Sequence, residues 1–110
     1  FAYGAIPCTR NMTEAEIEGE YELNTGKVIA ECFESRSIDP EAVPAVLVRS
    51  HGPFTWGKSA AEAAKNSAVL EAVAKDAYLS ERMNAPTANI FLQKKHYFRK
   101  HGANAYYGQK

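Results

Sequence analysis

The first half of the chain has hydrophobic positions spaced as on one face of a helix. Thr13 is followed three residues later by Glu16, the spacing of a capping box, so a helix is predicted to begin at "TEAEIEGE". Apolar side chains then recur at helical intervals, with glutamates on the other face. The stripe consists of Ile17, Tyr21, Val28, Cys32 and Phe33. Gly19 and Gly26 weaken the helical propensity, so we expect packing to hold this helix.

A short apolar run follows the break at "SRSIDPEAVP". "AVLVRS", residues 45–50, predicts a strand buried on both faces, and "HGPFTWGK" after it predicts a turn. This strand needs neighbours to satisfy its backbone groups. They could lie in the N-terminal residues of this chain or in sequence outside it, and we favour the second alternative.

Residues 59–83 show the clearest helical pattern of the chain. Ser59 and Glu62 have the spacing of a second capping box, and alanine dominates the following turns. Small residues at Ala60, Ala64 and Ala68 share one face, which predicts close packing of that face on a sheet or another helix. "NAPTAN" ends this helix, and a shorter one is predicted over residues 90–101.

Composition limits the class of protein. A chain of 110 residues suffices for one domain, and 13 basic residues balance 13 acidic ones, which argues against nucleic-acid binding. No apolar run reaches the roughly 20 residues that span a bilayer, so no membrane role is expected. Cys8 and Cys32 lack CxxC spacing and predict buried, reduced thiols and a cytoplasmic location. The start "FAYGAIPCTR" is typical of the interior of a folded protein, so we expect a longer chain.

His51 is the first candidate for chemistry. It follows the predicted strand and precedes Gly-Pro, a place where α/β proteins present ligands. It is either a metal ligand or a turn histidine whose ring hydrogen-bonds the adjacent turn. Zinc needs three or four protein ligands. His96 and His101 lie five residues apart, about 140° around a helix, so they do not easily bind one ion together.

Three further segments carry polar candidates. The cluster "QKKHYFRKH" is a solvated helix face with Tyr97 or Phe98 docked, a nucleic-acid surface, or a set of cations around His96 that faces a phosphorylated substrate. The tail "NAYYGQK" contains two tyrosines that either dock on the core or complete the active site of a neighbouring subunit as proton donors. By charge alone, Glu22 in "EGEYELNTG" belongs to a solvent-exposed acidic face.

Four of these motifs, in this order, resemble one group of enzymes. "IPCTR", "GEYELNTG", "SHGPFTWGK" and "KHYFRKHGANAYYGQ" together look like the C-terminal half of the L-ribulose-5-phosphate 4-epimerases, within the class II aldolase-like family. The resemblance implies an α/β fold, a three-layer α/β/α domain of which residues 1–110 form the C-terminal portion. It also implies a homotetramer with active sites between subunits. The implied reaction is zinc-dependent epimerisation of a sugar phosphate, L-ribulose 5-phosphate, to D-xylulose 5-phosphate by retro-aldol cleavage and aldol re-addition.

The resemblance also assigns roles to individual positions. His51 matches the last of three histidine ligands of Zn2+, and Tyr107 matches the acid/base tyrosine contributed across the interface. His96 matches a histidine near the substrate, and Glu22 matches a glutamate in the interface part of the site.

Several parts of the family pattern do not occur in this chain. The other two histidine ligands form an HxH pair, and this chain contains no HxH and no Gly/Ser-rich phosphate loop. The partner aspartate would fall directly before Phe1. We therefore expect the 110 residues alone to be inactive. The alternatives are an inert structural or oligomerisation module and a class II sugar-phosphate aldolase that stops after cleavage.

Overall fold

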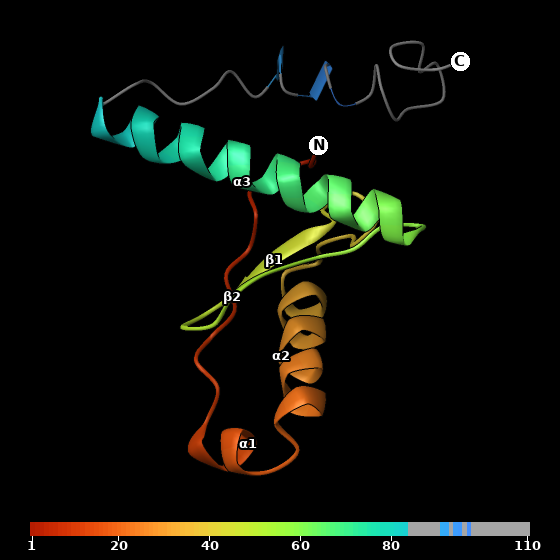
Figure 1. The fold of residues 1–110 in the computed structure, drawn as a ribbon, viewed down its shortest axis with the longest axis vertical. Coiled ribbons are helices and arrows are strands. Elements are labelled where there is room, and N and C mark those ends of the chain that lie inside the picture. The colour runs from red at the N-terminus through yellow and green to blue at the C-terminus, as the bar shows by residue number, and fades with distance from the viewer. Residues whose placement is uncertain (84–90, 93, 96, 98–110) are drawn as a thin grey trace.

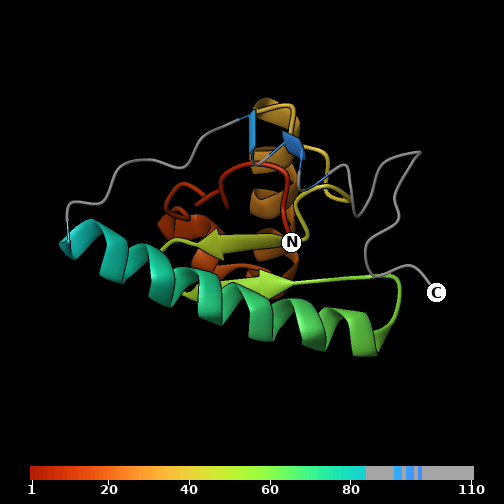
Figure 2. The same cartoon turned by 90° about the horizontal axis from the view of Figure 1, so that it is seen from above.

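Two long helices lie on opposite sides of a small β-hairpin in this computed structural model (Figures 1 and 2). The structure describes residues 1–83, 91, 92, 94, 95 and 97. The elements in chain order are α1 (Glu14–Glu18), α2 (Tyr21–Ser35), β1 (Ala45–Val48), β2 (Gly52–Thr55) and α3 (Ala60–Arg82). This mixture of helices and strands confirms an α/β fold.

Strand β1 has backbone partners on both sides. It pairs with β2 in antiparallel register, with Val46 opposite Phe54. On its other side the Leu47 N–H donates to the Pro7 carbonyl and the Thr9 N–H donates to the Leu47 carbonyl, both at 2.9 Å. This is a parallel bridge to the N-terminal segment. The favoured prediction, that the partners of β1 lie outside the chain, is therefore wrong for these two neighbours.

Strand β2 occupies residues for which a turn was predicted. A proline inside the run made a strand improbable, but the register explains why it is tolerated. Both backbone groups of Leu47 bond to the N-terminal segment, so the Leu47–Pro53 pair is of the type without inter-strand hydrogen bonds. Pro53 therefore removes no bond from the hairpin.

The predicted first helix is two helices. Thr13 and Glu16 form both reciprocal bonds of the capping box, as predicted, but α1 ends at Gly19. A Cβ atom at Gly19 would lie 3.0 Å from the Ala15 carbonyl oxygen, whereas Gly26 lies in open space inside α2. The two glycines therefore differ in effect: the chain breaks at Gly19 and continues as a helix through Gly26.

The apolar stripe of α2 packs on one face of the hairpin. Cys32 and Phe33 are buried against Val46 and Val48, and Trp56 closes the cluster with its ring edge against Phe33. This confirms the core part of the predicted stripe. Its first two members, Ile17 and Tyr21, are 51% and 38% exposed. Leu47 points to the opposite face and is 39% exposed, so β1 is not buried on both faces as predicted.

Helix α3 covers that opposite face of the hairpin. The Ser59 hydroxyl accepts from the Glu62 N–H, while the Glu62 carboxylate accepts from the Lys58 N–H instead of the Ser59 N–H, so only half of the predicted capping box forms. Thr55 donates its hydroxyl proton to the Ala63 carbonyl.

The side of α3 that faces the hairpin differs from the predicted one. Ala60, Ala64 and Ala68 are exposed, and Leu70 is the buried residue of the helix. Small residues occur all around this helix, so their positions could not identify the packed face.

The two cysteines are both free, and they differ in burial. Cys32 is buried, as predicted, but Cys8 is exposed. Cys8 lies in an extended segment between Pro7 and Thr9, which are both buried, so its side chain points to the other side. No helix in the described part of the chain is long and apolar enough to cross a membrane.

Most of the predicted helix over residues 90–101 lies outside the described residues. Its described members are helical, and Lys94 and Lys95 are exposed. The Tyr97 ring lies 5.0 Å from the Tyr3 ring, which confirms that Tyr97 docks on the rest of the chain. Burial raises the pKa of the Tyr97 hydroxyl, and the charge of Asp39 adds to this shift.

Candidate functional site

His51 lies in the loop of the hairpin, directly before β2. Its N–H donates to the Val48 carbonyl at 2.9 Å and closes a turn. The residues on either side have positive φ angles, 63° at Ser50 and 139° at Gly52. The second value is in a region that side chains other than glycine rarely adopt, so the backbone after His51 depends on Gly52. His51 therefore follows β1, as predicted, but it lies in the hairpin loop three residues after Val48, and the Gly-Pro after it begins β2 instead of a turn.

The His51 imidazole lies against two aromatic rings. The imidazole stacks on Phe54, with 5.2 Å between centroids and 18° between planes, and lies 6.5 Å from the Tyr21 ring. Among the described residues, none forms a hydrogen bond or an ion pair with the imidazole nitrogens. The alternative of a turn histidine that hydrogen-bonds its own turn is therefore wrong. As far as the described residues are concerned, both imidazole nitrogens are therefore available to bind a ligand.

Tyr21 brings the start of α2 to the hairpin loop. It is the first residue of α2, and Glu22 follows it in the first turn, where a carboxylate interacts favourably with the helix dipole. Glu22 is exposed, and its carboxylate forms no ion pair or hydrogen bond with the described residues. Glu22 thus follows Tyr21, the residue of α2 whose ring lies near the imidazole. The structure does not bring the Glu22 carboxylate into a contact of its own.

A complete metal site is not present in residues 1–83 and the few described residues beyond them. No group of three or more histidine, cysteine, aspartate or glutamate side chains is placed there to hold an ion. His51 is suited to be one ligand because its nitrogens have no partner among the described residues, and zinc needs at least two more ligands. His96 and Tyr107, the other predicted site residues, lie outside the described residues.

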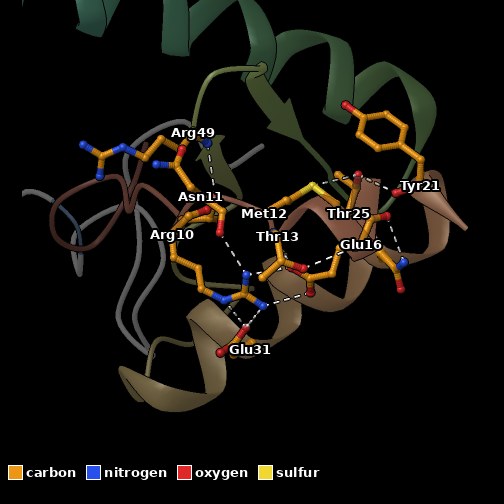
Figure 3. Close-up of polar contacts among 11 residues, drawn as sticks. Arg10, Asn11, Met12, Thr13, Glu16, Tyr21, Thr25, Glu31 and Arg49 are labelled. Carbon is orange, nitrogen blue, oxygen red and sulfur yellow. Dashed lines mark hydrogen bonds and ion pairs between the residues drawn. The ribbon is translucent and has the colours of Figure 1, made fainter. Parts of the chain in front are cut away.

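A network around Arg10 on the surface, which the sequence did not reveal, links the N-terminal segment to α1 and α2 (Figure 3). The Arg10 guanidinium donates two bonds to the Glu16 carboxylate, at 2.8 and 3.0 Å, and one to Glu31 at 3.1 Å. It thereby joins the N-terminal segment to α1 and α2. The hydrogen bond from Arg10 is the main reason why the pKa of Glu16 falls to about 2, and the Thr13 N–H adds to the effect. These charges lie 6 and 21 residues apart, so no local spacing could have indicated the network.

A buried hydroxyl ties the hairpin to the same segment. Thr9 is 1% exposed, and its hydroxyl accepts from the Arg49 N–H and donates to the Arg10 carbonyl, both at 3.1 Å. Arg49 is two residues before His51, so Thr9 anchors the backbone at the entrance to the loop.

Two apolar hollows lie away from the imidazole. One, of about 720 Å³, lies between α3 and the N-terminal segment and includes Leu47 and Leu70 in its lining. The other, of about 400 Å³, lies beside Trp56 on the outer face of α2. His51 lines neither of them. His51 itself is exposed in the hairpin loop.

Comparison with known families identifies a family model that covers most of the chain. The sequence model of the class II aldolase and adducin N-terminal domain matches residues 1–78, about 71% of the chain. The match includes His51 and Glu22, and it ends before the segment that contains His96 and Tyr107. Because the match covers well over half of the sequence, this chain belongs to the class II aldolase and adducin N-terminal domain family.

Proposed function

We propose that this chain forms part of the active site of a zinc-dependent epimerase that converts L-ribulose 5-phosphate to D-xylulose 5-phosphate. The observation that carries the proposal is the His51 imidazole, which is exposed at a strand end with both nitrogens free of described protein partners. Membership of the class II aldolase family supports it, since enzymes of this family often use a divalent metal. In this proposal the complete domain is a three-layer α/β/α unit in a homotetramer.

The proposed reaction needs few groups from this chain. A base removes the proton of the 4-hydroxyl while the C3–C4 bond breaks. The aldehyde fragment then rotates and presents its other face to the enediolate. The C3–C4 bond forms again on that face, and the proton returns to the 4-oxygen. Tyr107 is the proposed acid/base group on one face, because its hydroxyl can donate and accept that proton. His96 and Glu22 would bind and orient the substrate. A bound zinc ion would supply Lewis-acid polarisation.

The proposed zinc ligands are divided between this chain and an HxH pair that it does not contain. His51 would be the third ligand, as a neutral imidazole. Elemental analysis of the protein that carries this chain together with such a pair tests the assignment. We expect about one zinc ion per subunit, and loss of retained zinc in His51→Ala. Full zinc content in His51→Ala would contradict the assignment.

The reaction is tested separately from the metal. Tyr107→Phe removes only a hydroxyl, so we expect the fold and zinc content to be unchanged while epimerisation falls by a factor of about 100 or more. Near-normal turnover would remove Tyr107 from the acid/base role. Accumulation of the cleaved fragments by the wild-type enzyme would indicate the aldolase alternative.

A further inference from the structure

We propose that Phe54 is a positioning residue for His51: its ring restricts the imidazole to one orientation and thereby raises the affinity of the site for Zn2+. The inference rests on the proposed function, in which His51 is a zinc ligand. It starts from the offset stack of the two rings, whose planes differ by only 18° at 5.2 Å. Rings at this separation attract each other in an offset arrangement.

The backbone of Phe54 is fixed by strand pairing, although its side chain is 37% exposed. It lies in the middle of β2, opposite Val46, which is fully buried at 0% exposure. The neighbouring Leu47 directs its backbone groups to the N-terminal segment, so Val46 and Phe54 are the pair that exchanges hydrogen bonds. His51, in contrast, is an exposed residue of a loop. Strand pairing thus fixes the backbone from which the Phe54 ring extends to the imidazole, whereas the backbone of His51 belongs to the loop.

The stack replaces the usual means of orienting a metal-binding histidine. Such a histidine normally donates its second ring N–H to a carboxylate or a carbonyl, which fixes the ring. Within the described residues His51 has no such acceptor, and its ring contacts are Phe54 and the more distant Tyr21. An imidazole that is ordered before binding loses less side-chain entropy when it coordinates an ion. The expected gain is about three- to tenfold in zinc affinity.

The first test measures Zn2+ affinity by competition with a chromophoric chelator in the complete protein. We expect Phe54→Leu, which keeps apolar bulk but lacks a ring, to bind Zn2+ about three- to tenfold more weakly, and Phe54→Tyr to bind as wild type does. In a His51→Ala background Phe54→Leu should have no further effect. Tyr78→Leu, a change at an exposed aromatic residue of α3, is the matched control and should leave the affinity unchanged. Two outcomes overturn the proposal. One is that Phe54→Leu lowers the Zn2+ affinity equally in the presence and absence of His51. The other is that Phe54→Tyr lowers the Zn2+ affinity as much as Phe54→Leu does.

The second test needs no metal and therefore separates this inference from the proposed function. The ring current of Phe54 should shift the His51 ring protons upfield in the metal-free protein, and His51→Ala identifies these resonances. The shift should disappear in Phe54→Leu and persist in Phe54→Tyr; identical shifts in wild type and Phe54→Leu overturn the proposal. Phe54→Val, which favours a strand, repeats the comparison if Phe54→Leu does not fold. Absence of zinc binding in the wild type would instead refute the proposed function.

Discussion

Gly52 and Gly26 provide a matched test of how the hairpin loop is built. A methyl group added at either position meets no atom within 4 Å beyond the adjacent backbone, so tertiary packing does not distinguish the two cases. The backbone differs: Gly52 has a φ angle of 139°, whereas Gly26 is in the interior of α2. We therefore expect the same chemical change, glycine to alanine, to have opposite effects on the free energy of unfolding.

The magnitudes follow from the backbone alone. Alanine in a helix interior is more favourable than glycine, so Gly26→Ala should raise the free energy of unfolding by about 0.5–1 kcal/mol. Alanine at the φ angle of Gly52 is strained, so Gly52→Ala should lower it by about 1–3 kcal/mol. The two variants should therefore differ by roughly 1.5–4 kcal/mol, at least a tenfold difference in the unfolding equilibrium constant.

Urea unfolding at neutral pH measures this difference. Trp56 is the only tryptophan of the chain and packs on Phe33 in the core, so its fluorescence reports the transition, with circular dichroism as the second probe. Equal stability of the two variants, or a Gly52→Ala protein as stable as wild type, would refute the argument that the positive φ angle fixes this loop. The comparison requires that the urea concentration at the midpoint changes while the slope of the unfolding free energy against urea concentration stays the same.

Three further predictions concern the supports of the site. The hydrogen bond from Arg10 is the main cause of the low pKa of Glu16. The contribution of this carboxylate to the free energy of unfolding is therefore complete above its ordinary pKa of 4.5 and is lost as the pH falls toward 2. Urea unfolding of Glu16→Gln at several pH values should lack this part of the pH dependence. A thiol reagent should label Cys8 in the native protein and Cys32 only after unfolding, and equal rates would contradict the burial. Leu70→Ala should lower the free energy of unfolding by about 2 kcal/mol, the lower end for such changes because Leu70 lines a hollow, and a loss above about 4 kcal/mol would be inconsistent with that.

Local chemistry predicted the helix starts well and the helix faces less well. Thr13 and Ser59 begin helices as predicted because a cap depends on residues within one turn. The end of α1 at Gly19 was not predicted, although a weakness there was noted. It depends on a close approach to the Ala15 carbonyl and on the bond from the Asn24 side chain to the Glu16 carbonyl, which no propensity contains.

The second strand and the parallel bridge could not be predicted for a different reason. Both depend on register, which is set by contacts between distant segments. The tolerance of Pro53 depends on Leu47, and Leu47 is in turn committed to Pro7 and Thr9, about 40 residues earlier. A pattern of apolar residues identifies a buried strand, but it does not identify the segments that pair with it.

For the site, the sequence indicated the position of His51 but not the means by which it is held. The resemblance to class II aldolases singled out the histidine, and its role as a zinc ligand stays a prediction. Tyr21 was assigned to the core stripe and Phe54 to a turn, so neither was expected beside the imidazole. Stacking between a loop residue and a strand residue three positions later requires the hairpin register, which was itself not predicted.

The supports of His51 come from both sides of the loop, and this determines how substitutions elsewhere would act on it. On the entry side, the buried Thr9 hydroxyl holds the Arg49 N–H, and Arg10 beside Thr9 is fixed in the network that also holds α2. On the exit side, the imidazole rests on Phe54 of β2. The N-terminal segment therefore serves two purposes: it pairs with β1, and it sets the start of the loop. Because both supports belong to the hairpin and its neighbouring segment, the exposed His51 imidazole can have a defined position although its nitrogens form no hydrogen bond with the described residues.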